Sequence, residues 1–131
     1  MNKLSSSELM EITTNKYFAN VDKKNLEGVL LTLNKDANIN IVTDHLNHNG
    51  RDTEIANMLK GYFETYPNLW HGNFRSIIDE KKQSIVLKFD WKIIDVNNKE
   101  ESGSNVNVFH SENNKISKIA IYMSSGNNPL K

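Results

Sequence analysis

Four histidines, one tyrosine and two asparagines are the residues of this sequence whose side chains could carry chemistry. His71 follows Trp70 at the start of a strand-like segment, and an imidazole titrates near neutral pH, so His71 is a candidate catalytic acid or base. A strand-end histidine bonded to the backbone is the alternative interpretation. Tyr17 could donate its hydroxyl to a ligand or serve the core. The amides of Asn105 and Asn107 hydrogen-bond without transferring protons, which favours recognition over catalysis.

The other histidines give no pattern of a metal site. His45 and His48 lie three residues apart beside Asp44, but no third ligand stands at a motif spacing. We therefore interpret them as surface loop residues and expect no metal and no other cofactor. His110 should point outward, because its neighbour Phe109 is expected to point inward. The absence of cysteine excludes disulfides, thiolate zinc sites and cysteine nucleophiles.

Composition narrows the class of protein further. The 131 residues include 16 Lys plus Arg and 16 Asp plus Glu, with 37% hydrophobic residues, which is typical of one globular domain. We expect that domain to span residues 1–131, with an ordered core of about 6–123. A net charge of zero argues against a nucleic acid or an anionic membrane as partner. Because no apolar run approaches the ~18 residues of a membrane span and no signal-peptide core is present, we expect a cytoplasmic protein.

Helical spacing of apolar residues predicts three helices in the first half of the chain. Ser5 and Glu8 have the spacing of a capping box and precede a first helix over about 6–20. Asp22 is expected to cap a second, short helix. A third helix is expected over about 55–66, where apolar residues recur at intervals of three and four.

Alternation of apolar and polar residues predicts the strands. One strand is expected over 37–43, and the segment 45–50 is expected to be a polar turn. From Leu69 onward the period stays at two, with short polar connections typical of hairpins. The strands expected there are 70–79, 84–96, 102–110 and 115–123.

The longest of these strands shows how the sheet should be oriented. Its apolar residues Phe89 and Trp91 share one face, and Lys88, Asp90 and Lys92 share the other. One face of the sheet should therefore be packed, while the charged face is solvated or meets a partner. The element order α-α-β-α-β-β-β-β predicts an α+β fold in which the helices pack on the concave face of a curved antiparallel sheet.

Several short motifs in this order resemble the nuclear-transport-factor-2-like superfamily. They are Tyr17-Phe18, the segments 25–29 and 36–39, the segment 50–55 at the start of the third helix and the segment 113–119 entering the last strand. The nearest branch is that of the SnoaL-like proteins, which also includes ketosteroid isomerases, polyketide cyclases and limonene epoxide hydrolases. The resemblance spans nearly the whole chain.

This resemblance implies a cone of curved sheet that encloses a pocket, and a homodimer formed through the outer face of the sheet. It also implies that a small apolar molecule binds in the pocket. The residues expected to reach the pocket from the helices are Tyr17, Met58 and Tyr62. Those expected from the strands are Ile41, Phe89, Trp91, Asn105, Asn107, Phe109 and Ile121.

The catalytic groups of the related enzymes are missing at the matching positions. The base of the ketosteroid isomerases matches Ile41, and their proton-donating aspartate matches Asn105 or Asn107, so Tyr17 alone is retained. The Asp-Arg-Asp group of the epoxide hydrolases is not evident. The first hypothesis is therefore a binding domain for a small apolar or aromatic molecule. The alternatives are an isomerase, cyclase or hydrolase that uses His71 and Tyr17, and a protein-interaction adaptor.

Overall fold

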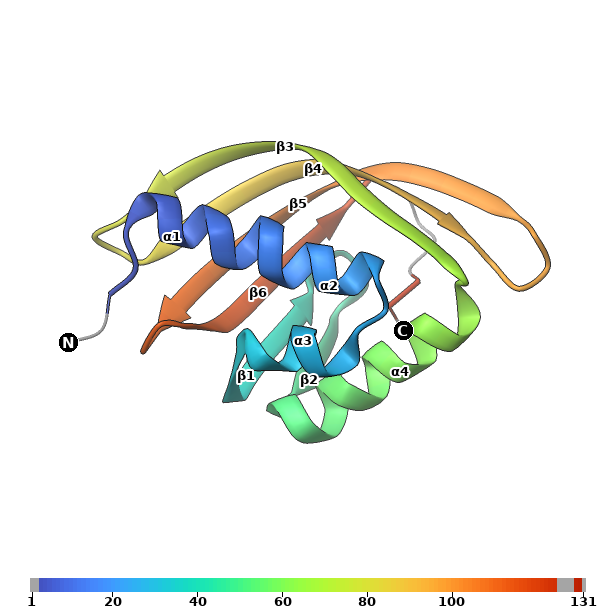
Figure 1. The fold of residues 1–131 in the computed structure, drawn as a ribbon, viewed down its shortest axis with the longest axis horizontal. Coiled ribbons are helices and arrows are strands. Elements are labelled where there is room, and N and C mark those ends of the chain that lie inside the picture. The colour runs from blue at the N-terminus through green and yellow to red at the C-terminus, as the bar shows by residue number, and fades with distance from the viewer. Residues whose placement is uncertain (1–2, 125–128, 131) are drawn as a thin grey trace.

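A curved sheet with helices on one side forms the framework that holds the site (Figure 1). The computed structural model describes residues 3–124 and 129–130. The predicted α+β class is confirmed. The helices are α1 (Ser6–Met10), η1 (Glu11–Phe18), α2 (Ala19–Asp22), α3 (Leu26–Leu31), η2 (Val42–Asp44), η3 (Gly50–Ile55) and α4 (Ala56–Thr65). The strands are β1 (Leu33–Ile41), β2 (Leu46–Asn49), β3 (Asn68–Asp79), β4 (Ser84–Ile94), β5 (Glu100–Glu112) and β6 (Lys115–Met123).

The first helix is a continuous rod made of α1, η1 and α2, and it ends two residues later than predicted. The capping box is confirmed: the Glu8 backbone N–H donates to Ser5 Oγ at 3.2 Å, and the Ser5 N–H donates to Glu8 Oε1 at 2.9 Å. The middle turns, η1, are widened to π-helical turns. Thr13 and Thr14 lie there and donate to backbone carbonyls one turn earlier. Widened turns of this kind often occur at functional sites.

Asp22 does not cap the second helix, contrary to the prediction from its position. It is the last residue of α2, and Asn25 caps α3 instead by accepting a hydrogen bond from the Gly28 N–H at 3.2 Å. The two residues Lys23 and Lys24 that follow α2 turn the chain, with Lys24 at φ 56°. The Asp22 carboxylate is therefore available for a partner elsewhere in the chain.

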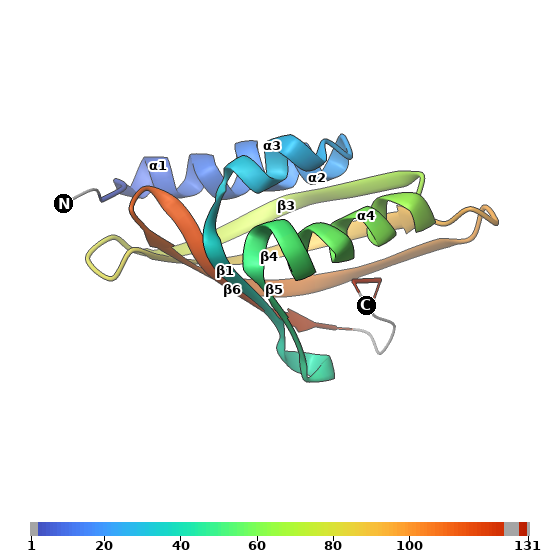
Figure 2. The ribbon, with the colours of Figure 1, turned by 90° about the horizontal axis from the view of Figure 1, so that it is seen from below.

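The sheet has the strand order β2-β1-β6-β5-β4-β3, with β2 and β3 at its open edges. Strands β3 to β6 form the predicted antiparallel meander, but β1 runs parallel to β6, so the sheet is mixed and not purely antiparallel. Figure 2 shows the sheet curving beneath the helices. Alternation of apolar and polar residues does not show whether two strands run parallel or antiparallel, because both arrangements bury the same face of the strand.

The segment 45–50 contains strand β2 rather than only the predicted polar turn. It pairs antiparallel with β1, with His48 opposite Ile39. Polar side chains add to this pairing, because the Asn38 amide donates to Asn49 Oδ1 at 2.7 Å and to Asn47 Oδ1 at 3.3 Å. Residues of low β propensity therefore form an edge strand through pairing and not through local preference.

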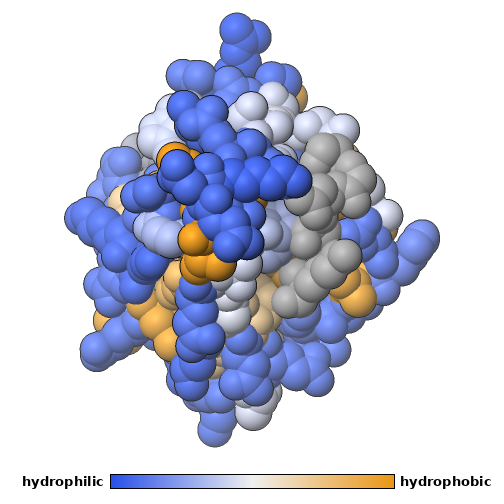
Figure 3. All heavy atoms as spheres, turned by 90° about the vertical axis from the view of Figure 1, so that its right-hand side faces the viewer, coloured by the Kyte–Doolittle hydropathy of each residue, from blue (hydrophilic) through white to orange (hydrophobic). Residues whose placement is uncertain are grey.

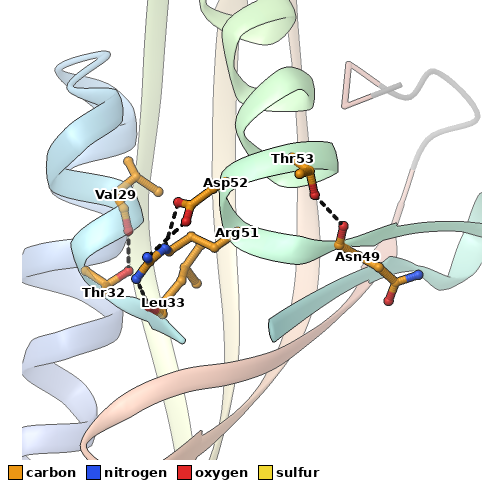
Figure 4. Close-up of polar contacts among 7 residues, drawn as sticks. All are labelled: Val29, Thr32, Leu33, Asn49, Arg51, Asp52 and Thr53. Carbon is orange, nitrogen blue, oxygen red and sulfur yellow. Dashed lines mark hydrogen bonds and ion pairs between the residues drawn. The ribbon is translucent and has the colours of Figure 1, made fainter. Parts of the chain in front are cut away.

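The third helix begins earlier than predicted, with the widened turns of η3, and α4 ends at Thr65 before Pro67. Arg51 fastens its start to the neighbouring α3–β1 connection (Figure 4). The guanidinium donates to the Leu33 carbonyl at 3.4 Å and to both carboxylate oxygens of Asp52, at 2.9 and 3.1 Å.

The core lies between the sheet and the helices, as the alternation predicted. On β4 the apolar residues Ile85, Leu87, Phe89, Trp91 and Ile93 are all buried, whereas Lys88 and Lys92 are exposed. The strand ends at Ile94, two residues before the predicted end. The inner face of the sheet and the apolar sides of the helices thus enclose the space in which a site can form.

Replacing Asn25 by Ala should lower the free energy of unfolding by about 1 kcal/mol, because α3 loses its N-terminal cap. Chemical denaturation of the two proteins measures the difference. Asn57→Ala is the matched control, since Asn57 is exposed within α4 and alanine favours a helix. Equal stability of Asn25→Ala and the wild type would contradict the capping role.

Candidate functional site

Asp22 and His71 form a side-chain pair between the end of the helical layer and the edge strand β3. The His71 Nδ1 atom lies 2.6 Å from Asp22 Oδ1, and the His71 backbone N–H donates to Asp22 Oδ2 at 3.0 Å. Because an ionised carboxylate can only accept hydrogen bonds, this contact places a proton on Nδ1. In the neutral ring the lone pair then belongs to Nε2, which is the form of a general base.

Aromatic rings hold the His71 imidazole from the sides. The ring centroid of Phe18 lies 4.9 Å from that of His71 at an interplanar angle of 31°, and the Phe89 centroid lies at 5.7 Å. The His71 side chain is only 9% exposed. Within the described residues, no protein group is hydrogen-bonded to Nε2. The imidazole is therefore fixed at Nδ1 and largely shielded from bulk water.

His71 lines a cavity of about 30 Å³ between the helices and the sheet. This volume corresponds to roughly one water molecule. Polar residues from four elements line it: they are Tyr17, Tyr62, His71, Asn105 and Asn107. The apolar remainder of its wall is formed by Phe18, Val21, Leu59, Phe89, Ile121 and Leu130. Apolar walls with a few convergent polar groups are the usual lining of a small-molecule site, and such sites commonly have volumes of about 300–1,000 Å³.

Two buried tyrosines, Tyr17 and Tyr62, line this cavity. Burial raises the pKa of Tyr17, and burial together with the Asp22 carboxylate raises the pKa of Tyr62. Both hydroxyls therefore stay protonated at neutral pH and can donate hydrogen bonds, but neither serves as a base. The Tyr17 ring is held edge-on against Phe18 and Phe109, at centroid distances of 5.1 and 5.7 Å.

The two asparagines of β5 differ in how their amides are used. The Asn105 Oδ1 atom accepts a hydrogen bond from the indole Nε1–H of Trp91 at 2.9 Å, so its oxygen is engaged inside the core. Asn107 is 2% exposed, and its Oδ1 atom has no hydrogen-bond partner among the described residues. A buried acceptor without a partner is costly and rare in proteins.

Some of the residues that the sequence analysis expected in a pocket line this cavity. Of the expected pocket residues, Tyr17, Tyr62, Phe89, Asn105, Asn107 and Ile121 line the cavity, and His71 joins them. Ile41, Met58, Trp91 and Phe109 are buried in the core but do not line the cavity.

Asp22 and Leu130 were not anticipated from the sequence. Asp22 contacts a residue 49 positions away, and no local pattern indicates such a contact. The one available signal was its place about one turn after Phe18 on the first helix. Leu130 reaches the cavity from beyond the last strand, where the sequence has no periodicity.

The remaining histidines lie away from the cavity. His45 is exposed at φ 56°, and His48 lies on β2 with its Nε2 atom buried and without a partner in the described structure, so His48 is not the plain surface residue that was expected. His110 on β5 lies 3.3 Å from Ser84 Oγ and 3.5 Å from Glu112. In residues 3–124 and 129–130, no group of three His, Asp or Glu side chains is placed to hold a metal ion.

The surface at the end of the molecule nearest the β4–β5 turn is mostly hydrophilic, with apolar residues in small separate areas (Figure 3). In the part of the chain that is described, no helix is long and apolar enough to cross a membrane.

Solved structures establish the type of fold. AusH from Aspergillus nidulans matches with a TM-score of 0.80 and 14% identity, covering 96% of this chain and 90% of that one. An NTF2-like protein of unknown function from Burkholderia pseudomallei has a TM-score of 0.77 and 16% identity, covering 92% of each chain. An LEH-like epoxide hydrolase from M. tuberculosis has a TM-score of 0.77 and 13% identity, covering 90% and 84%.

No family model matches the sequence, and no curated protein matches it. The fold resemblance indicated by the sequence motifs is nevertheless confirmed, because these structures share the nuclear-transport-factor-2-like fold over most of the chain. At such low identity the comparison establishes the fold, and the activity has to be argued from the site.

The Tyr17→Phe variant should lose less free energy of unfolding than the wild type when the pH is raised into the alkaline range. The pKa of Tyr17 is higher in the folded protein than in the unfolded chain, so the folded state holds its proton more tightly. Stability from this source is complete below about pH 10 and is lost as the pH rises further. Chemical denaturation at neutral and at alkaline pH measures this slope. If the slope above about pH 10 were equal in both proteins, Tyr17 would not be buried as described.

Proposed function

We propose that this fold binds a small, largely apolar molecule beside the Asp22–His71 pair and that His71 transfers a proton on that molecule. The observation that carries the proposal is the 2.6 Å contact between His71 Nδ1 and Asp22 Oδ1 at the wall of the cavity. A carboxylate that orients an imidazole is a common way to prepare a general base. The name of one structural neighbour, an epoxide hydrolase, agrees with small-molecule chemistry in this fold.

Each polar group has a role in this proposal. His71 Nε2 accepts a proton from the ligand, and the Asp22 carboxylate stabilises the imidazolium that forms. The Tyr17 hydroxyl, which stays protonated, donates to an oxygen atom of the ligand on which negative charge develops. The proton then returns from Nε2 to a second atom of the ligand, which makes the net reaction an isomerisation or an elimination.

The size of the cavity sets a condition on this reaction. A space of about 30 Å³ holds one hydroxyl group or water, so a larger ligand needs lining side chains to move. Leu130 is the lining residue farthest along the chain, and it is only partly buried. Displacement of its side chain would give a ligand room in the cavity that His71 lines.

Binding without catalysis is the second candidate function. It is favoured by the two positions that match the carboxyl groups of the related isomerases. Ile41 is buried and apolar, and both candidates for the second position, Asn105 and Asn107, are amides. In that case the site recognises a ligand and the Asp22–His71 pair only holds β3 to the helices. Proton transfer on a probe molecule distinguishes the two functions.

We also propose that the chain forms a homodimer through the outer face of the sheet. Apolar residues from neighbouring strands adjoin there in register, Ile77 beside Val86 and Val86 beside Val108. Ile77 is 75% exposed, and Tyr122 on the same face is 48% exposed. The row Lys88, Asp90 and Lys92 borders this apolar strip. Exposed apolar side chains within a polar rim are typical of an interface between subunits.

Substitution of His71 by Gln should strongly slow the exchange of protons that the protein catalyses at a carbon atom next to a carbonyl group. The probe is cyclohexanone in deuterium oxide, and NMR records the loss of its α-proton signal. We expect the wild type to accelerate exchange over buffer and His71→Gln to lower the accelerated rate by about 100-fold or more, because the base is lost. Asp22→Asn should lower it less, since Nε2 remains.

The matched control for this experiment is His45→Asn, which replaces an exposed histidine outside the cavity. It should exchange the probe as fast as the wild type. A wild-type rate equal to that of buffer, together with probe-dependent shifts in the spectra of the cavity residues, would support binding without catalysis.

The Ile77→Asp variant should be monomeric, because a charge in the apolar strip opposes burial of the outer face. Light scattering at micromolar concentration should give a dimer for the wild type, with at least ~1,000 Å² buried in its structure. Val96→Asp is the control, since Val96 is also well exposed but lies in the β4–β5 connection. A wild-type monomer would refute the proposed interface.

A further inference from the structure

Asn107 is a polar residue of the cavity that is buried in the core and whose acceptor is unused among the described residues. Its side chain projects from the inner face of β5, between Asn105 and Phe109. The residue is 2% exposed, and among the described residues nothing donates to Oδ1. The neighbouring Asn105 shows the usual solution, because its oxygen is paired with the Trp91 indole N–H at 2.9 Å.

An apolar residue would be the more stable choice at this position. A buried acceptor without a donor loses its hydrogen bonds to water on folding and regains none, whereas a leucine of similar size loses nothing of the kind. Polar groups retained at a cost to stability are found mainly at functional sites. Asn107 lines the same cavity as His71 and Tyr17, so a molecule bound in that cavity could donate the missing hydrogen bond.

We propose that the ligand supplies this donor, and that the site selects molecules that carry a hydroxyl group. The inference rests on the proposed function and narrows its substrate class. The cavity of about 30 Å³ matches the volume of one hydroxyl group or water, and Asn107 Oδ1 accepts the hydrogen bond of that hydroxyl. Tyr17 and Tyr62 line the same cavity, and their hydroxyls stay protonated. An acceptor atom on the ligand can therefore bind a tyrosine hydroxyl while the ligand hydroxyl donates to Asn107.

This arrangement differs from a site built only for a ketone. A ketone oxygen accepts hydrogen bonds, so it is satisfied by Tyr17 or Tyr62 but leaves Asn107 Oδ1 without a partner. A hydroxy ketone satisfies both. Sites that hydrogen-bond a hydroxyl group discriminate strongly against analogues that lack it, because the protein group is then buried unpaired.

The test compares phenol with fluorobenzene, two rings of similar size of which only phenol donates a hydrogen bond. Binding is measured by titration of the amide NMR spectrum, with the resonances of Tyr17, Tyr62 and His71 as reporters. We expect the wild type to bind phenol at least about tenfold more tightly than fluorobenzene. Asn107→Leu should bind fluorobenzene as the wild type does and lose the preference for phenol.

Stability gives an independent measure of the same residue. Asn107→Leu should raise the midpoint of thermal unfolding by about 4 °C or more, because an unpaired buried acceptor is removed. Asn105→Leu is the matched comparison and should lower it, since the Trp91 N–H then loses its acceptor. A lower midpoint for Asn107→Leu would overturn the inference, because it would mean that the amide stabilises the folded protein without a ligand.

The outcomes separate this inference from the proposed function. If both probes bind the wild type equally, the cavity binds small molecules and the hydroxyl preference is refuted. A preference for benzaldehyde over phenol would also refute it, since that would turn the Asn107 NH2 group toward the ligand. If neither probe shifts the reporter resonances in the wild type or in Leu130→Ala, where the cavity is enlarged, the small-molecule site itself fails.

Discussion

The carboxylate of Asp22 holds the edge strand of the sheet to the helical layer, and the candidate site depends on this contact. One of its oxygens accepts from the His71 backbone N–H and the other lies 2.6 Å from the imidazole, so strand and side chain are fixed together. An edge strand otherwise has unpaired backbone groups along one side. Asp22 satisfies one of these groups on β3 and, with the same side chain, orients the ring that lines the cavity.

The apolar surroundings give the polar groups of this site their character. Aromatic rings flank the imidazole, and burial keeps the Tyr17 and Tyr62 hydroxyls protonated. A hydrogen bond in such surroundings is electrostatically stronger than in water, and a group without a partner is correspondingly costly. The cavity therefore contains two kinds of amide. The Asn105 oxygen is hydrogen-bonded within the protein, whereas the Asn107 oxygen has no partner among the residues that the structure describes.

Sequence patterns predicted the parts of this structure that depend on local periodicity. The alternation along β4 and the capping box at Ser5 are both confirmed, because each reflects contacts a few residues apart. Strand β2 and the parallel pairing of β1 with β6 could not be predicted in this way, since both depend on a partner distant in sequence or on side-chain amides. The Asp22–His71 contact belongs to the same class, so the sequence predicted the lining residues Tyr17, Asn105 and Asn107 and a candidate histidine, but not the carboxylate that orients it.

The parallel pairing of β1 with β6 has a consequence for the order in which the chain folds. Strands β3 to β6 are joined by short turns, so each can pair with its neighbour as soon as both have been made. Strand β1 (Leu33–Ile41) pairs with β6 (Lys115–Met123), which is the last strand in the chain order. Long-range pairing of this kind is slow, because a large loop must close before any contact rewards it. During synthesis β1 therefore emerges well before β6, and the edge of β1 that pairs with β6 remains unpaired until that strand has been made.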